Sequence, residues 1–257
     1  MNKNDISIQL YTTRNFQPYN KILNFISETG ITNIELFGLE NLNIEDFKKM
    51  MDDYNVTFKS SHFGFEALTN PSNIIERAKA LNIQHVIVPA PPLKGDSFKD
   101  QFVLSEDEWI SFGKNLSSYV SIFEDSGLTL GYHNHSYEFK PLPSMKLPIE
   151  CVMEHNENLK FEIDLGWSIA GGAEPKPWIE KYSKKIIACH LKDFFDKQKD
   201  MLDHNNQSAV GDGFINWNEI INSIRQTNCE LFILEHDDPK DYKDYTLRSI
   251  NNLRDIK

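Results

Sequence analysis

Two histidines stand two residues apart in the stretch LTLGYHNHSYEF, residues 128–139, where an apolar run ends. Alternate side chains of a β-strand point to the same face, so His133 and His135 would share one side. Glu138 follows three positions later. Imidazole and carboxylate groups gathered in one place can bind a divalent metal ion or move a proton. A polar strand end with a purely structural use is the alternative interpretation.

Polar residues also end other apolar runs of the chain. Asp164 ends FEID, His190 ends IIACH and Glu235 ends LFILE, and these are three consecutive runs. His62 ends a further run, within SSHFG. Neutral imidazole together with carboxylate suits a divalent ion such as Mn, Zn, Co or Fe. The joint pattern therefore predicts a metal site, although each residue alone is more often a hydrogen-bonded structural group.

Three neighbours of these residues are candidates for contact with a substrate. Lys192 follows His190 by two, so it should face the same side and could stabilise a developing oxyanion. A salt bridge from Lys192 to Asp193 or Glu235 is the alternative. Trp167 and Phe63 are candidates for apolar walls against a sugar ring, with ordinary core packing as the alternative for each. We assign substrate binding to His62, Phe63 and Trp167.

Eight short apolar runs, separated by longer amphipathic stretches, must position these side chains. Two helix starts are marked: Asn43 is a candidate N-cap, and Ser105 with Glu108 forms a capping-box pattern. Strict alternation of strand and helix implies a parallel sheet, and eight strands in 257 residues favour a closed (β/α)8 TIM barrel, a single domain over 1–257. The expected strands are 6–11, 33–38, 56–64, 83–90, 128–135, 159–166, 185–193 and 231–237.

The barrel prediction also places the site. Active sites of such barrels form at the C-terminal ends of the strands, so the polar strand ends should converge on one mouth. The polar segment 194–210 resembles neither a helix nor a strand and is expected to act as a lid. Since no Gly-x-Gly-x-x-Gly pattern follows the first strand, an open dinucleotide-binding sheet is disfavoured.

Composition limits the partners and the compartment. A net charge of −11 argues against nucleic-acid binding. The sequence contains no run of about 18 apolar residues, so it predicts no membrane span. The three cysteines, Cys151, Cys189 and Cys229, form no CxxC pair, which fits a reducing cytoplasm. We therefore expect a cytoplasmic protein with a small-molecule partner, and the sequence leaves homo-oligomerisation open.

The ordered set SHFG, GYHNHSYEF, EIDLGWSIAGGAEP, CHLKD, GDGFINW and LEHD resembles the sugar phosphate isomerase/epimerase family, with its xylose isomerase-like TIM barrel. The likeness covers nearly the whole chain. It implies one divalent ion (Mn, Mg, Co, Zn or Fe) held by Glu, Asp, His and Glu. Asp164, His190 and Glu235 match three of these ligands, and His133 stands in the place of the first glutamate. The implied metal set is His133, Asp164, His190 and Glu235, with Glu138 as the alternative to His133.

The resemblance also implies roles in a reaction. His135 matches a catalytic or supporting histidine and Glu138 a substrate-contacting glutamate, while Trp167 replaces a histidine that many members have. The expected catalytic set is His135, Glu138, Lys192 and Glu235. The expected activity is that of a metal-dependent isomerase or epimerase, which removes a proton next to the carbonyl of a sugar, sugar phosphate or cyclitol.

The missing first glutamate keeps other functions open. The epimerases of the family use two metal-bound glutamates as paired bases, and this chain has only one of them. A metal-dependent dehydratase or lyase acting on a keto-sugar or cyclitol is the first alternative. A non-enzymatic sugar-binding barrel is the second. An abasic-site endonuclease shares the barrel but conflicts with the negative net charge.

Overall fold

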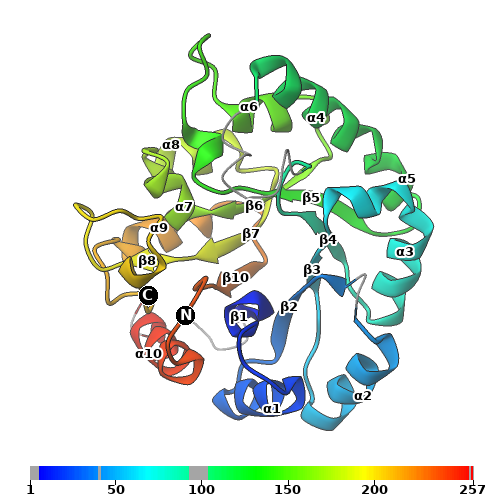
Figure 1. Ribbon diagram of the computed structural model, residues 1–257, viewed down its shortest axis with the longest axis vertical. Helices are drawn as coiled ribbons and strands as arrows, with labels where there is room; N and C mark the ends of the chain where they lie inside the picture. The colour runs from blue at the N-terminus through cyan, green and yellow to red at the C-terminus, as the bar shows by residue number, and fades with distance from the viewer. Residues whose placement is uncertain (1–5, 40–41, 93–103, 255, 257) are drawn as a thin grey trace.

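Eight parallel strands close into a barrel at the centre of the computed structural model, which describes residues 6–39, 42–92, 104–254 and 256 (Figure 1). Each strand pairs with the next along the chain, and β1 pairs with β10 to close the ring. The predicted TIM barrel is confirmed. The barrel strands are β1 (Ile6–Gln9), β2 (Asn33–Phe37), β3 (Ser60–His62), β4 (His85–Val88), β5 (Thr129–His133), β6 (Lys160–Asp164), β7 (Ile186–Leu191) and β10 (Leu231–Leu234).

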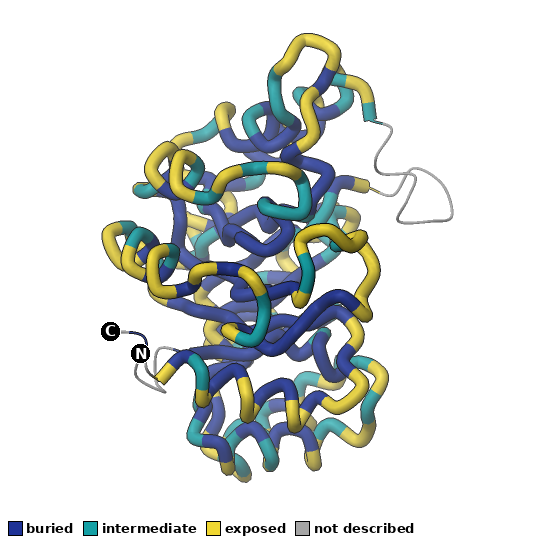
Figure 2. Tube along the Cα trace, turned by 90° about the vertical axis from the view of Figure 1, so that its left-hand side faces the viewer, coloured by how far each residue is buried: buried dark blue, intermediate teal, exposed yellow. Residues whose placement is uncertain are grey.

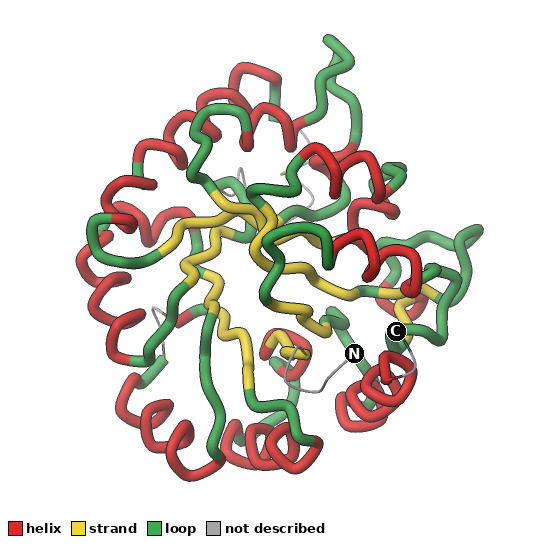
Figure 3. Tube along the Cα trace, turned by 180° about the vertical axis from the view of Figure 1, so that it is seen from behind, coloured by secondary structure: helices red, strands yellow, loops and turns green. Residues whose placement is uncertain are grey.

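Helices surround the strands, as the view from behind also shows (Figure 3). Both predicted helix starts are present: the Asn43 side chain accepts from the backbone N–H groups of Glu45 and Asp46, and Ser105 and Glu108 form a capping box. The helices are α1 (Tyr19–Thr29), α2 (Ile44–Tyr54), α3 (Pro71–Ala80), α4 (Glu106–Ser118), α5 (Val120–Glu124), α6 (Pro148–Met153), α7 (Leu165–Ala170), α8 (Pro175–Lys181), α9 (Trp217–Ile224) and α10 (Tyr242–Arg254).

Apolar side chains fill two separate spaces. The larger core lies between the strands and the helices, and the chain is buried where it runs through the barrel and exposed at the outer turns (Figure 2). A second, smaller cluster from β4, β7 and β10 consists of Ile87, Ile187, Ala188, Leu231 and Ile233. Ala188 and Ile233 precede His190 and Glu235 by two positions, so this cluster fills the barrel one layer below those polar residues.

The largest differences from the expected elements lie at β3 and in the segment 194–210. β3 covers only Ser60–His62 of the expected 56–64, and Thr57 makes an isolated bridge to Asn33. The segment 194–210 is not irregular, because β8 (Asp193–Phe194) pairs with β9 (Gln207–Ser208) and the 3₁₀ turn η7 (His204–Asn206) lies between them. Among the described residues, no helix has both the length and the apolar character needed to cross a bilayer.

The single-domain range 1–257 extends over residues outside the described part of the chain and stays a prediction.

Candidate metal centre and active site

A cavity of about 540 Å³ opens at the C-terminal ends of the strands. Five of the residues assigned from the sequence line it: His62, His133, His135, Trp167 and Glu235. Asp164, His190 and Lys192 are fully buried. The remaining lining residues are Tyr11, Phe37, Gly38, Gly64, Pro89, Ala90, Ser136, Leu202, His204 and Asp237.

Four of the assigned residues bring metal-binding atoms together at this mouth. His133, Asp164, His190 and Glu235 each offer one ligand atom, and these atoms lie within 4.8 Å of one another. Parallel pairing accounts for part of the convergence, because Asp164 on β6 lies opposite His190 on β7. We call this set the mouth group. It contains the predicted metal ligands, and Glu138 does not belong to it.

The donors of the mouth group fit a divalent ion. Asp164 Oδ1 accepts the Trp167 N–H at 2.7 Å and so caps α7, while Asp164 Oδ2 is buried without a hydrogen-bond partner. A buried carboxylate oxygen in a folded protein normally has such a partner. Two imidazoles and two carboxylates are a donor set that Mn, Fe, Co and Zn all accept.

The middle residue of His-Asn-His holds the ends of two strands together. Asn134 donates from Nδ2 to the Asp164 carbonyl oxygen at 3.0 Å, and its Oδ1 accepts the Asp164 N–H at 2.9 Å. The two flanking histidines point to the opposite face, as the alternation predicts. Asn134 therefore fixes the backbone of Asp164 beside His133.

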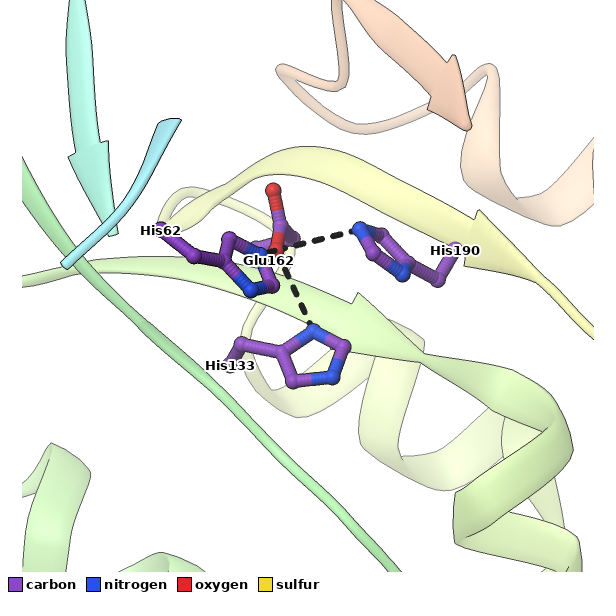
Figure 4. A group of neighbouring side chains, drawn as sticks. All are labelled: His62, His133, Glu162 and His190. Atoms are coloured by element: carbon purple, nitrogen blue, oxygen red, sulfur yellow. Dashed lines mark hydrogen bonds and ion pairs between the residues drawn. The ribbon is translucent and has the colours of Figure 1, made fainter. Parts of the chain in front are cut away.

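A second polar cluster lies on the inner faces of the strands, and two of its members, Glu35 and Glu162, were not expected from the sequence. Glu162 Oε2 lies 2.6 Å from His62 Nε2, 3.1 Å from His133 Nδ1 and 3.2 Å from His190 Nε2 (Figure 4). We call His62, His133, Glu162 and His190 the deep group; its ligand atoms also lie within 4.8 Å of one another. Glu35 Oε2 lies 2.7 Å from His190 Nε2.

The sequence did contain a signal for both glutamates. Each is a charged residue in the middle of an apolar strand, in NIELF and KFEID. Alternation places Glu162 on the same face as Asp164, two positions nearer the start of β6. The strand ends therefore carry only part of the polar cluster, and the two glutamates lie beneath them.

The buried charges of this cluster shift one another's pKa. Burial alone would lower the pKa of His62, but Glu35 and Glu162 outweigh it and raise that pKa to about 10. Glu162, Glu235 and Glu35 likewise raise the pKa of His190 against the effect of burial. Burial and the neighbouring His190 lower the pKa of His133 well below its usual value. His133 is therefore a neutral imidazole, the form that binds metals.

Lys192 is held between acidic side chains at the mouth. Its Nζ lies 2.8 Å from Asp237 Oδ2 and 3.0 Å from Glu235 Oε2, and 4.6 Å above the Trp167 ring centroid. Burial lowers the pKa of Lys192, but Asp237 and Glu235 more than offset this and raise it, so the side chain stays protonated. Of the two alternative partners for Lys192, Glu235 is present, together with the unforeseen Asp237.

Glu138 lies behind His135 and not in the cavity lining. Its carboxylate accepts the Tyr132 hydroxyl at 2.6 Å and the His135 N–H at 2.9 Å, and burial raises its pKa to about 8. Burial and the charge of Lys192 lower the pKa of His135 to about 4, so that imidazole is neutral. Glu138 thus fixes the backbone at His135, which itself lines the cavity.

One sequence-based placement needs correction. Phe63 is fully buried in the larger core and does not line the cavity, because it follows His62 by one residue and so points away from the barrel interior. Leu202 and His204, both from the segment 194–210, also line the cavity.

The sequence of this chain is similar to those of known proteins. Residues 23–256 match the model of the family described as xylose isomerase-like TIM barrel. The chain belongs to this family. Among curated proteins, inosose dehydratase of Clostridium perfringens is 23% identical over 219 residues, which cover 75% of this chain and 73% of that protein. Inosose dehydratases of Bacillus thuringiensis and Bacillus cereus are 25% identical, and this chain matches 50% of their length.

Solved structures with this barrel carry several names. A sugar phosphate isomerase/epimerase from Parabacteroides distasonis has a TM-score of 0.78 at 20% identity, over 100% of this chain and 96% of that one. The probable 3-DHS dehydratase AsbF from Bacillus anthracis has a TM-score of 0.79 at 17% identity, over 98% and 100%. The IOLI protein, with a bound zinc atom, has a TM-score of 0.73 at 14% identity, over 98% and 97%. At these identities the likeness concerns the fold.

Proposed function

We propose that this protein is a metal-dependent enzyme that removes a proton next to the carbonyl group of a sugar, sugar phosphate or cyclitol, and so acts as an isomerase or epimerase. The observation that carries the proposal is the mouth group. Two imidazoles and two carboxylates converge beside a cavity of about 540 Å³, and one of the carboxylate oxygens has no hydrogen-bond partner.

The metal would be held by His133, Asp164, His190 and Glu235. A divalent ion bound there supplies Lewis-acid polarisation of the substrate's carbonyl oxygen. The zinc bound to the structurally similar IOLI protein supports a metal in a barrel of this kind. Elemental analysis of the purified protein identifies which of Mn, Mg, Co, Zn and Fe it binds.

The chain's own residues supply the proton chemistry in this proposal. Burial raises the pKa of Glu235, but Lys192 and His190 outweigh it and hold that pKa low, so the carboxylate is ionised and can accept a proton. Lys192, protonated beside it, stabilises negative charge that develops on the substrate oxygens. Neutral His135 relays a proton or binds a hydroxyl. Trp167 gives the ring of the substrate an apolar wall, and His62 also lines the cavity.

Dehydration of a keto-sugar or cyclitol is the second candidate. His133 stands where a two-base epimerase would need a glutamate, whereas loss of water needs one base and one acid. Here Glu235 would be the base and protonated Lys192 the acid. The curated relatives named inosose dehydratase favour this candidate.

The experiment is incubation of the metal-loaded protein with aldoses, ketoses, their phosphates and inososes, with products identified by NMR and mass spectrometry. An isomer of unchanged mass supports the first candidate, and a product that has lost water supports the second. Turnover should vanish in Glu235→Gln. A substrate that raises the melting temperature but gives no product with any of the five metals would contradict both candidates and favour a sugar-binding barrel.

A further inference from the structure

We propose that the deep group, His62, His133, Glu162 and His190, is a metal site in its own right, which binds a divalent transition ion without Asp164 or Glu235. This concerns metal binding alone and goes beyond the proposed reaction. The ion expected is one that accepts three imidazole nitrogens and one carboxylate oxygen, such as Zn²⁺ or Co²⁺.

The metal-binding atoms of the deep group converge on one point. Three ring nitrogens from three different strands surround a single carboxylate oxygen at 2.6, 3.1 and 3.2 Å (Figure 4). His133 and Glu162 are direct partners in the pairing of β5 with β6, so the backbone itself sets them side by side. All four residues are buried, and rigid strands hold them. Such preorganisation is what a metal site needs.

The deep group also contains buried polar atoms without a hydrogen-bond partner. His133 Nδ1 lies 3.1 Å from Glu162 Oε2 but forms no hydrogen bond, and Glu162 Oε1 has no hydrogen-bond partner. One oxygen cannot be an acceptor for three rings with good geometry. An ion among these atoms would satisfy the nitrogen lone pair of His133 and a carboxylate oxygen together. Buried polar groups in folded proteins are normally satisfied in one way or another.

Two buried carboxylates give the deep group and its surroundings a negative charge. Glu35 and Glu162 bury two carboxylates around the same rings, with Glu35 Oε2 3.3 Å from His62 Nε2. Burying carboxylates is costly unless cations accompany them. A divalent ion would compensate both charges in place of the protons on His62 and His190, which are released when the two rings become ligands. Gln9 Nε2 donates to Glu35 Oε2 at 2.8 Å and so keeps that carboxylate in place beside the site.

The deep group and the mouth group share two rings but use His190 differently. His190 Nδ1 lies 3.0 Å from Glu235 at the mouth, whereas Nε2 faces Glu35 and Glu162 below. The deep group therefore needs neither Asp164 nor Glu235, and removing these two carboxylates separates the sites experimentally.

The test measures binding of Zn²⁺ and Co²⁺ to metal-free protein by equilibrium dialysis with elemental analysis, and the cobalt absorption spectrum reports the ligand geometry. We expect Asp164→Asn/Glu235→Gln to retain about one ion per chain with a tetrahedral cobalt spectrum, because His62, His133, Glu162 and His190 remain. Adding Glu162→Gln should weaken binding by more than about 100-fold, the upper range for losing even an outer-shell partner. Glu219→Gln, an exposed position on α9, is the matched control and should bind as the wild type does.

Circular dichroism and the melting temperature show whether each variant folds. If the folded Asp164→Asn/Glu235→Gln protein binds neither ion, or if Glu162→Gln and His62→Ala leave its binding unchanged, the proposal is wrong. Should the triple variant with Glu162→Gln not fold, adding His62→Ala to Asp164→Asn/Glu235→Gln must instead abolish the rise in melting temperature that Zn²⁺ gives the Asp164→Asn/Glu235→Gln protein. Neither outcome depends on turnover, so failure of the deep site and failure of the proposed reaction are distinguishable.

Discussion

Glu138 shows how a residue assigned to catalysis acts at the scale of a single side chain. Its carboxylate lies behind His135 and accepts hydrogen bonds from Tyr132 and from the His135 backbone. Burial raises its pKa from 4.5 to about 8, so the folded protein holds a proton there that the unfolded chain releases. The stability that this proton contributes is fully present below pH 4.5 and is lost as the pH rises through about 8.

We therefore expect the free energy of unfolding of the wild type to fall more steeply between about pH 5 and 8 than that of Glu138→Gln, which cannot ionise. Urea unfolding at a series of pH values measures both. Asp164 and the other buried groups are present in both proteins, so the difference between the curves reports the ionisation of Glu138 together with its effect on its charged neighbours. Parallel curves would show that Glu138 does not titrate as its burial implies.

Lys192 is the cation that pairs with two acidic side chains at the mouth of the barrel. Replacing it with methionine leaves the buried carboxylates of Asp237 and Glu235 without their cation, and breaking such a buried pair costs about 3–5 kcal/mol. We expect Lys192→Met to lower the free energy of unfolding by about that much at pH 7. Lys192→Met/Asp237→Asn should recover part of the loss, because one unpaired charge is removed. A double variant no more stable than the single one would contradict this electrostatic explanation.

At the scale of the elements, Asp193 connects the small hairpin to the glycine-containing loop that precedes α9. Its carboxylate accepts the N–H groups of Gly211 at 2.9 Å and Gly213 at 3.3 Å, and the indole N–H of Trp217 at 2.8 Å. The close approach at Gly213 leaves no room for a side chain, since a Cβ there would lie 2.2 Å from Asp193 Oδ1. The carboxylate of Asp193 thus anchors the loop GDGFINW to the hairpin.

We expect Asp193→Ala to cost about 3 kcal/mol or more, because several buried donors lose their acceptor at about 1–3 kcal/mol each. In a chain of this size that corresponds to a fall in melting temperature of about 6–12 °C. Asp196→Ala, on the same hairpin but half-exposed, is the comparison, and calorimetry gives both values. Equal shifts for the two variants would mean that Asp193 is not the anchor of the loop.

The alternation of side chains explains which parts of the site could be predicted from the sequence. Polar residues at strand ends are conspicuous against apolar runs, so the order of residue types alone was enough to group His133, Asp164, His190 and Glu235. Glu35 and Glu162 escaped because a residue in the middle of a strand shows its role only when neighbouring strands are in register. Asp237 and His204 lie on loops, whose paths no periodic pattern reveals.

At the scale of the whole molecule, the closed barrel makes one chemical mouth out of residues far apart in the chain. The order and parallel direction of the strands followed from the alternation of strands and helices, and the structure confirms them. The sequence did not show how far below the mouth of the barrel each inward-facing side chain lies. Inside the barrel the side chains form layers, and the apolar cluster of β4, β7 and β10 lies beneath the polar residues at the strand ends.

Exchange of the hydrogen next to a substrate's carbonyl with solvent deuterium tests the central claim most directly, because isomerisation, epimerisation and dehydration all begin by removing that proton. NMR follows the exchange in D₂O, with metal content measured in every sample. We predict exchange by the metal-loaded wild type, loss of exchange with a chelator, and a rate lower by about 100-fold or more in metal-containing Glu235→Gln. If the metal-loaded wild type leaves this hydrogen unexchanged in aldoses, ketoses, their phosphates and inososes, or if Glu235→Gln exchanges it equally fast, the account is contradicted.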